Sequence, residues 1–455
     1  MNTKKTIWLI ASVFYIGHAQ LYSQADTATK QFTLQAAIDY ATAHNYTYLN
    51  AENDAKYNTY RKNEIAAQGL PQINGTADLR DNVLLPTQLL PASFGPAFGI
   101  NTGQPIPVKF GVPYNLTASA SASQLIFSSD YLVGVQAAKE LINLSQKNLL
   151  RSKVETAQNV SKAYYGVLIN KERIKILDLN IDRVKLLKDN TIALNQNGFA
   201  EKIDVDRLEV NYNNLVTEKE KTLRLVQLSE LALKFQMGYD LQRPIELSDD
   251  MSKIESGEDA QSINADNTDI SKRPEVMALQ SQQKLNEYDL KRYRLSYLPS
   301  LSAYGLIAEQ FQKSQLDFNS KNSWFPFAYI GATLNVPIFD GLQKHWRVEE
   351  AKVNLMKTQN SFSQLKQSIR LEIQTATVNY KNALVSLQTQ KRNIGLARNV
   401  YEVTKKKYDQ GIGSSIDMNT TENDLHTAES NYYNSLYDLI IAKIDYQKAT
   451  ATLIK

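Results

Sequence analysis

Two stretches of the chain, NQNGFAEKIDVDRLE at 195–209 and YDQGIGSSIDMNTTE at 408–422, repeat one pattern. In each, a glycine is followed five residues later by isoleucine, then by aspartate and, after four intervening residues, by glutamate. The matched pairs, all 213 positions apart, are Gly198 and Gly411, Ile203 and Ile416, Asp204 and Asp417, and Glu209 and Glu422. The pattern predicts one local structure built twice.

The repetition extends well beyond these turns. Lys139 matches Lys352 at the same offset, QLIFSSD at 124–130 resembles VPIFDGL at 336–342, and GLPQINGTADL at 69–79 resembles YLPSLSAYGLI at 297–307. Self-similarity at a fixed offset is the signature of internal repeats. We therefore expect a first repeat at 32–239 and a second at 274–455. Residues 240–273 form an acidic, irregular connector with some short structure.

The segments before each glycine read as long helices. No proline occurs between 114 and 243 or after 337, and apolar residues recur every seven positions. Such spacing is typical of coiled coils. About 70 residues at 1.5 Å each give a rod of roughly 105 Å, and a glycine at its end favours the left-handed conformation that stops a helix. The heptad residues are Val160, Val167, Ile174 and Ile181, with Ala163, Leu177 and Val184 between them; the copies are Ile373, Tyr380, Leu387 and Ile394, with Ala376, Ala383 and Ala397.

Four runs with a period of two residues predict strands. They are QINGTADLR at 72–80, YNLTASASASQ at 114–124, SLSAYGLIA at 300–308 and AYIGATLNV at 328–336. Runs of about ten alternating residues are typical of membrane β-strands. Trp324, Phe325, Phe327 and Tyr329 read either as an interfacial aromatic girdle or as an ordinary hydrophobic patch. The segments 81–113 and 309–323 read as long loops.

The N-terminus reads as a secretory signal peptide. Lys4 and Lys5 precede a short apolar run, and small residues allow cleavage after Ala19, or up to residue 24; a buried N-terminal helix is the alternative. No later stretch approaches the ~18–20 apolar residues of a membrane helix. The mature chain is therefore either soluble outside the cytoplasm or inserted through its strands.

Composition and motifs argue against several function classes. The net charge of +4 is too small for a typical nucleic-acid binder, and there is no cysteine. The four histidines do not lie at metal-ligand spacing, and no catalytic or phosphate-binding motif occurs. We expect no enzyme, no cofactor and no metal. A periplasmic adaptor, or a coiled-coil stalk or scaffold, remains the alternative to a channel.

Four strands cannot close a barrel, since known barrels begin at about eight strands. If the strands span a membrane, the chain must therefore oligomerise. From about Phe32 to the C-terminus the chain also resembles the TolC-type outer-membrane efflux family. The motifs that carry the resemblance are FTLQAAIDYATAHN at 32–45, the two Leu-Pro strand starts, QLIF, VPIFDGL and the two glycine turns.

The resemblance implies a homotrimer with a 12-stranded outer-membrane barrel, continued by a long α-helical tunnel through the periplasm. It would be the exit duct of a tripartite efflux or type I secretion system, docked on a periplasmic adaptor and an inner-membrane pump. Tyr408, Asp417 and Asp204 match gate positions of the family, whereas Gly413 and Thr420 stand where some members have an arginine and a second aspartate.

After each glycine the helical pattern resumes, from Ile203 and from Ile416, so we expect each half to end in a helical hairpin. The tips of these hairpins are the predicted docking points for the adaptor. They carry Gly198 and Phe199 in the first repeat and Gly411 and Ile412 in the second. Two alternatives stay open at this point. The tip residues could fold back on neighbouring helices, and either aspartate could simply cap the helix that begins beside it.

Overall fold

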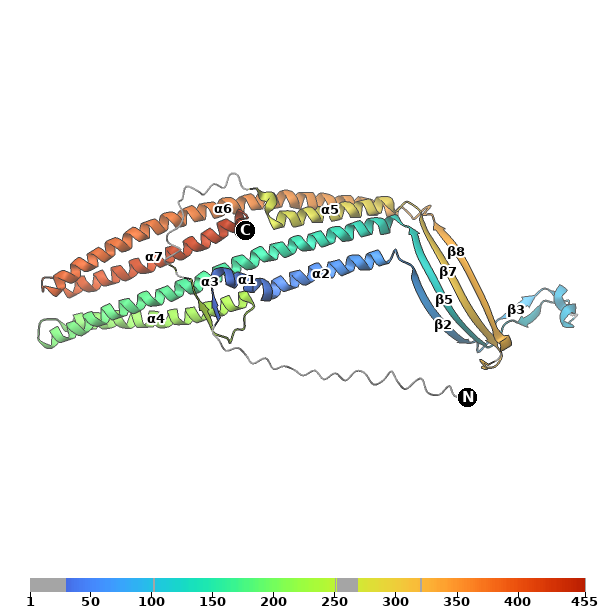
Figure 1. The fold of residues 1–455 in the computed structure, drawn as a ribbon, viewed down its shortest axis with the longest axis horizontal. Coiled ribbons are helices and arrows are strands. Elements are labelled where there is room, and N and C mark those ends of the chain that lie inside the picture. Colours follow the sequence, from blue (N-terminus) through green and yellow to red (C-terminus); the bar gives the residue numbers. More distant parts are fainter. Residues whose placement is uncertain (1–29, 101–102, 250, 252–268, 320, 455) are drawn as a thin grey trace.

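The computed structural model describes residues 30–100, 103–249, 251, 269–319 and 321–454, and the predicted signal peptide lies outside them. The molecule is elongated, with a β-sheet at one end and two helix tips at the other (Figure 1). None of the helices in these described ranges combines the length and apolarity needed to cross a membrane. The helices are α1 Leu34–His44, α2 Tyr46–Ala67, α3 Ser129–Gln196, α4 Lys202–Met237, α5 Pro274–Leu295, α6 Gln343–Asp409 and α7 Ser415–Ala449.

Four strands form one antiparallel sheet in the order β2-β5-β7-β8. These are the four strands that alternation predicted: β2 Gln72–Asp81, β5 Tyr114–Phe127, β7 Ser300–Lys313 and β8 Trp324–Asn335. The two central strands, β5 and β7, pair with each other although they are far apart in sequence. In the described part of the chain, β2 and β8 each pair on one side only.

The register gives β2 and β5 one apolar and one polar face, whereas β7 and β8 carry apolar residues on both faces, and the charged Glu309 lies on the apolar face. Ile73 lies opposite Ala122, Ala122 opposite Gly305, and Gly305 opposite Ile330, so these four residues form one row on one face. That face is uncovered in the chain: Ile73 is 76% exposed and Ile330 93%. The neighbouring row on the other face joins Asn74 to Ser121 and Ser121 to Leu306. Alternation thus puts β2 and β5 serine, threonine and asparagine side chains on the second face.

The aromatic cluster at the start of β8 is divided between the two faces. Trp324 lies opposite Phe311 in the sheet, and the centroids of their rings are 5.3 Å apart. The Trp324 indole also donates a hydrogen bond to the Phe318 carbonyl. Phe325, Phe327 and Tyr329 alternate with the apolar row and therefore lie on the opposite face. The four aromatic residues therefore do not share one face, and an interfacial girdle stays a prediction for Phe325, Phe327 and Tyr329.

Two helical hairpins make up the other half of the molecule. α3 and α4 form one hairpin and α6 and α7 the other, as the glycine turns predicted. α3 has 68 residues and α6 has 67, and the shorter α2 and α5 run beside their sheet-proximal halves (Figure 1). The heptad prediction is confirmed by burial of the seam residues Val160, Val167, Leu177 and Val184 in α3 and Ile373, Ala376, Tyr380 and Ala383 in α6.

A compact junction forms near the middle of the long axis. Strand β1 (Lys30–Phe32) pairs in parallel with β6 (Ile245–Leu247), which lies in the predicted connector. The buried Tyr164 hydroxyl of α3 donates to the Phe32 carbonyl and contacts the Asp249 carboxylate, both at 2.9 Å. Burial and this carboxylate raise the pKa of Tyr164. The junction therefore ties both ends of the first half of the chain to α3.

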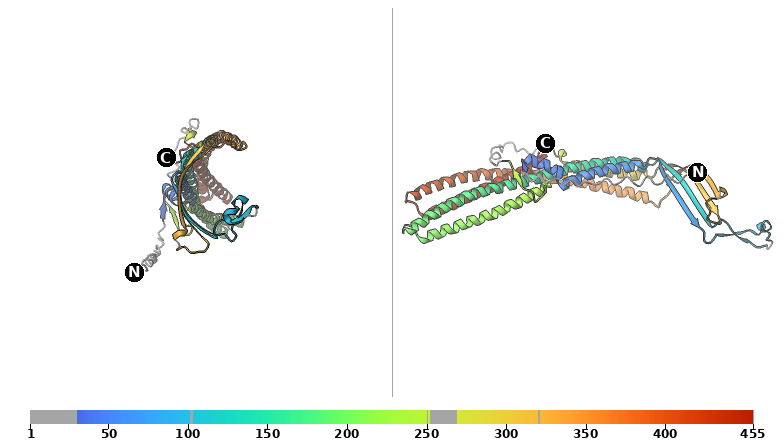
Figure 2. Two further views of the ribbon diagram at one scale, coloured as in Figure 1. Left: turned by 90° about the vertical axis from the view of Figure 1, so that its right-hand side faces the viewer. Right: turned by 60° about the horizontal axis from the view of Figure 1, so that its bottom comes forward.

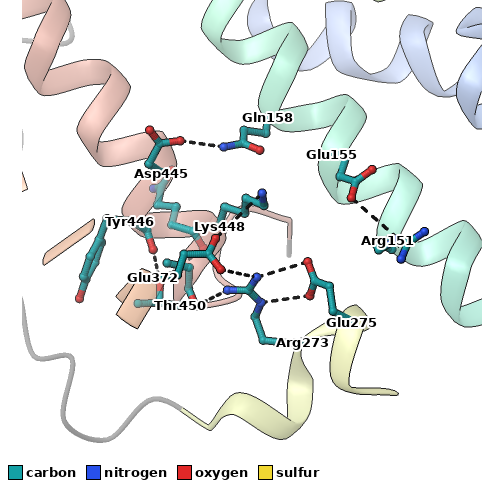
Figure 3. A network of polar contacts seen from close by, with 12 residues as sticks. Arg151, Glu155, Gln158, Arg273, Glu275, Glu372, Asp445, Tyr446, Lys448 and Thr450 are labelled. Carbon is teal, nitrogen blue, oxygen red and sulfur yellow. Dashed lines mark hydrogen bonds and ion pairs between the residues drawn. The ribbon is translucent and has the colours of Figure 1, made fainter. Parts of the chain in front are cut away.

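Arg273 anchors the second half of the chain in a similar way (Figure 3). Arg273 is only 3% exposed. Its guanidinium donates to the Glu275 carboxylate at 3.1 and 3.2 Å, to the Glu372 carboxylate of α6 at 2.9 Å and to the Ala449 carbonyl at 3.1 Å. Burial alone would lower the pKa of Arg273, but the two carboxylates raise it. One side chain thus joins the start of α5, the middle of α6 and the end of α7.

The two predicted loops differ from expectation. Within 81–113, β3 (Thr87–Leu90) and β4 (Ile106–Lys109) form an antiparallel hairpin around a 3-10 helix at Ala92–Phe98. This hairpin projects beyond the sheet (Figure 1), and an end-on view places it on the open side of the arc formed by sheet and helices (Figure 2). Strand β7 also continues to Lys313, so the polar loop is shorter than 309–323.

Gly238 at the end of α4 should tolerate no side chain. Its φ is +67°, and an added Cβ would lie 2.2 Å from the His44 carbonyl oxygen. Gly238→Ala should therefore cost more than the ~1–2 kcal/mol of left-handed strain alone. Urea unfolding in detergent, followed by circular dichroism, measures the loss.

Gly198→Ala is the matched control for this substitution. Its φ is also positive, at +80°, but no atom lies within 4 Å of the added Cβ. Only the backbone strain should then be lost. Equal destabilisation by the two variants would contradict the steric account of Gly238.

Candidate functional site

Both hairpin tips use the same backbone turn. Gly198 and Gly411 have φ of +80° and +75°. The Phe199 amide donates to the Leu194 carbonyl at 2.8 Å, and the Ile412 amide donates to the Lys407 carbonyl at 3.0 Å. The Gly198 amide also donates to the Asn195 carbonyl at 3.0 Å, and the Gly411 amide to the Tyr408 carbonyl at 2.9 Å. The two bonds at each tip together make a Schellman motif. The sequence repetition at the tips therefore corresponds to the same hydrogen bonds in both turns.

The apolar tip residues do not fold back onto the chain. Phe199 is 82% exposed and Ile412 is 74% exposed. A Schellman motif often brings the residue after its glycine onto the last helical turn, but neither side chain is buried there. Each tip thus presents one large apolar side chain to solvent.

The two predicted gate aspartates occupy equivalent places. Asp204 is the third residue of α4 and Asp417 the third residue of α7. Neither is the N-cap: that position is Glu201 in α4 and Ser414 in α7, and the Ser414 hydroxyl accepts from the Asp417 amide at 3.0 Å. Among the described residues, neither carboxylate forms an ion pair or a side-chain hydrogen bond. Both charges lie at positive helix ends and are free to interact elsewhere.

Tyr408 lies one turn before the second tip and links the two hairpins. Its hydroxyl lies 3.1 Å from the Thr191 hydroxyl of α3. The Thr191 hydroxyl donates its proton to the Leu187 carbonyl at 2.8 Å, so Tyr408 must be the donor in the shared bond. The Tyr408 ring packs against a buried cluster of Leu187, Leu208, Tyr401, Met418 and Leu425. The structure therefore joins Tyr408 to the first hairpin, while the two aspartates remain separate from it.

A groove runs between α4 and α7 just behind the tips. It has a volume of about 440 Å³ and is lined mainly by polar residues, and the Asn211 amide donates to Asn419 across it at 2.9 Å. Asparagine on both walls offers hydrogen bonds to a partner, and Asp206 and Arg207 add one charge of each sign to the lining. In the described ranges, no group of three histidine, aspartate or glutamate residues is placed to hold a metal ion.

A buried ionic cluster farther along the helices was not anticipated. Arg183 of α3 donates to Glu422 of α7 at 2.8 Å and approaches Glu429 at 3.4 Å. Glu422 is 2% exposed and Glu429 is 3% exposed. Burial raises the pKa of Glu422, which Arg183 offsets only in part, and burial raises the pKa of Tyr401 on the adjoining helix to about 12. The seven-residue spacing of the two glutamates was the available sequence signal, because it places both in the coiled-coil seam.

Comparison with known proteins connects this architecture to a family. Residues 268–452 match the model of the outer membrane efflux protein family. The outer membrane protein TolC of Vibrio cholerae is 19% identical over 404 residues, covering 88% of this chain and 90% of that protein. The chain has the fold of a TolC-type outer-membrane efflux protein.

Solved structures agree with that assignment. The CmeC outer membrane channel of Campylobacter jejuni superimposes with a TM-score of 0.73 at 18% identity, over 93% of this chain and 86% of that one. The open state of the MtrE outer membrane channel of Neisseria gonorrhoeae gives a TM-score of 0.72 at 14% identity, over 92% and 89%. The resemblance seen in the sequence is confirmed.

Removal of the Tyr408 hydroxyl should loosen the second tip. Tyr408→Phe and Thr191→Val each delete the same hydrogen bond, worth about 0.5–1.5 kcal/mol. Each should therefore speed trypsin cleavage at Lys405–Lys407, and the double variant should be no faster than the quicker single one. The control is Tyr57→Phe, which changes a tyrosine that is 59% exposed on α2. Additive effects of the two substitutions would contradict the link.

Proposed function

We propose that three copies of this chain form a passive exit channel through the outer membrane, with the helices as a tunnel in the periplasm. The observation that carries the proposal is the sheet: four strands, unclosed, apolar on one face and rich in small polar residues on the other. In lipid, an unpaired strand edge leaves backbone groups unsatisfied. Three copies supply twelve strands, enough to close the edges on one another.

The orientation follows from the two faces of the sheet. The row containing Ile73 and Ile330 faces lipid, and the row containing Asn74 and Ser121 faces the lumen. The β3–β4 hairpin then lies at the outer mouth of the channel, and the helix tips lie farthest from the membrane (Figure 1). The long helices continue the same wall into the periplasm.

Apolar residues on the outer helix surfaces support the assembly. Val210, Leu228 and Phe235 of α4 are 60%, 62% and 68% exposed in the single chain. Val378 and Val385 of α6 are 55% and 64% exposed. Such rows on long helices need a partner, and neighbouring copies in a ring would cover them.

The tips are the docking surface for a periplasmic adaptor, which connects the tunnel to an inner-membrane pump. Support comes from the exposed Phe199 and Ile412, and from the polar groove between α4 and α7. The pump selects the cargo, and the channel performs no chemistry on it. An adaptor or scaffold role accounts less well for this chain, because neither explains a sheet with one uncovered apolar face.

The gate at the periplasmic mouth consists of Asp204, Asp417 and Tyr408. In a trimer the aspartates supply six carboxylates at the narrow end, and Tyr408 holds α6 against α3 through Thr191. An acidic ring attracts cations and favours their passage.

The purified protein should be a trimer in detergent. The expectation follows from the two unpaired sheet edges, which a monomer cannot satisfy in a membrane. Light scattering or native mass spectrometry measures the mass. A monodisperse monomer that remains folded would contradict the proposal.

The aspartate ring should set the ion selectivity. In planar bilayers, the channel should show a small cation-selective conductance that multivalent cations block from the periplasmic side. Asp204→Ala combined with Asp417→Ala should remove block and selectivity, whereas Tyr408→Phe should only raise conductance. The control is Asp81→Ala in β2, which lies on the same face as Ile73 and far from the tips. Unchanged block in the double variant would exclude these aspartates from the pore.

Gly411→Trp should abolish export while leaving trimer and membrane insertion intact. No atom lies within 4 Å of a Cβ built at Gly411, so the fold has room for a side chain there. The large side chain would nevertheless reshape the docking tip, and the positive φ at this position would be strained. Export of a pump substrate from intact cells provides the readout. Undiminished export would place the docking surface elsewhere.

A further inference from the structure

His426 lies among three helices, beside the ionic cluster of Arg183. It belongs to α7, and its two ring nitrogens contact different partners. Nδ1 is 2.8 Å from the amide nitrogen of Asn180 on α3, and Nε2 is 3.2 Å from a carboxylate oxygen of Glu218 on α4. The imidazole therefore connects the second hairpin to both helices of the first.

The tautomer of the neutral imidazole is fixed by the orientation of Asn180. The Asn180 side chain is fully buried, and its carbonyl oxygen accepts a hydrogen bond from Arg183. Its NH₂ group must then face His426, because the reverse orientation would direct two donors at each other. Nδ1 of His426 consequently accepts a hydrogen bond, and the ring proton is on Nε2, where it is donated to Glu218.

A second proton on His426 would disrupt this arrangement on one side only. Protonated Nδ1 would point its hydrogen at the Asn180 NH₂ group, which has no acceptor to offer. Turning the amide over would instead break its bond to Arg183. On the other side, protonation converts the contact with Glu218 into an ion pair. Protonation thus weakens the α7–α3 contact and strengthens the α7–α4 contact.

The surroundings allow the ring to respond. A cavity of about 130 Å³ adjoins His426, whose side chain is 19% exposed, so protons can reach the ring. Charged and titratable groups lie on every element around it. They are Arg173 and Arg183 on α3, Glu218 on α4, Tyr401 on α6, and Glu422, Glu429 and Tyr433 on α7.

We propose that His426 is a proton-sensitive link between the two hairpins, which holds α7 against α3 when neutral and shifts it towards α4 when protonated. Histidine changes charge between about pH 5 and 8, within the range that a compartment outside the cytoplasm can reach. In the proposed channel this shift would change the arrangement of the helices behind the gate, and that consequence alone rests on the proposed function.

Hydrogen exchange of the full chain in detergent tests the link directly. Amides of α3 near Asn180 should exchange about five-fold faster at about pH 5.5 than at about pH 7.5, after correction for intrinsic rates, as expected when one ordinary hydrogen bond is lost. His426→Gln should remove this response. His345→Gln, at an exposed position near the start of α6, is the matched control and should retain it.

The variant Asn180→Asp provides a second, independent test in the same hydrogen-exchange experiment. A carboxylate at this position, with Glu218 on the other side of the ring, favours the protonated imidazole and accepts from it and from Arg183 together, so α3 should stay protected at both pH values. A wild-type pH response in His426→Gln or in Asn180→Asp would overturn the proposal. Since exchange does not require a pore, a failed conductance experiment with an intact exchange response would count against the channel and not against the link.

Discussion

The unpaired edges of the four-stranded sheet are the constraint on which the rest of the structure depends. β2 and β8 each expose a row of backbone donors and acceptors, and the sheet has one face that is apolar and uncovered. Neither feature suits an isolated chain in water or in lipid. Both are resolved together if copies join edge to edge and turn the apolar face outwards. Because the helices continue from the strands, the same arrangement brings the helical hairpins into a ring.

The two glycine turns matter because they set where this ring ends. A Schellman motif at Gly198 and another at Gly411 reverse the chain at the same distance from the sheet, so the hairpins end together (Figure 1). Each turn is followed by an aspartate in the third helical position. In the proposed trimer, equal hairpins with equally placed charges would meet at the periplasmic mouth. The hydrogen bond from Tyr408 to Thr191 and the cluster around Arg183 hold the two hairpins of one chain together near these turns.

Much of this fold could be predicted from local sequence patterns. Alternation identified β2, β5, β7 and β8, heptads ending at a glycine identified α3 and α6, and the helical pattern after each glycine identified α4 and α7, because these signals depend on backbone periodicity alone. The internal repetition itself remains an interpretation of the sequence. The β3–β4 hairpin was missed because six prolines in 81–113 suggested an irregular loop. The opposite orientation of Phe325 and Trp324 follows from strand alternation alone, so the sequence itself separates Trp324 from Phe325, Phe327 and Tyr329.

The contacts around the candidate site were harder to predict for a different reason. Arg183 and Glu422 are 239 positions apart, and Tyr408 and Thr191 are 217 apart, so only the packing of one hairpin on the other brings them together. The exposure of Phe199 and Ile412 could be anticipated, since a short turn offers no core. Residue roles at the gate and tips remain proposals that the described geometry supports.

Disulfide trapping between the sheet edges tests the central claim most directly. The chain has no cysteine, so Ala77→Cys in β2 combined in turn with Ala328→Cys or Ala332→Cys in β8 introduces the only thiols. All three positions lie on the apolar face. Edge-to-edge closure of three copies predicts, for at least one pair, a covalent ladder in denaturing gels that stops at the trimer. The claim would be contradicted if both cysteine pairs gave only monomers, or if the ladder of linked chains continued beyond the trimer.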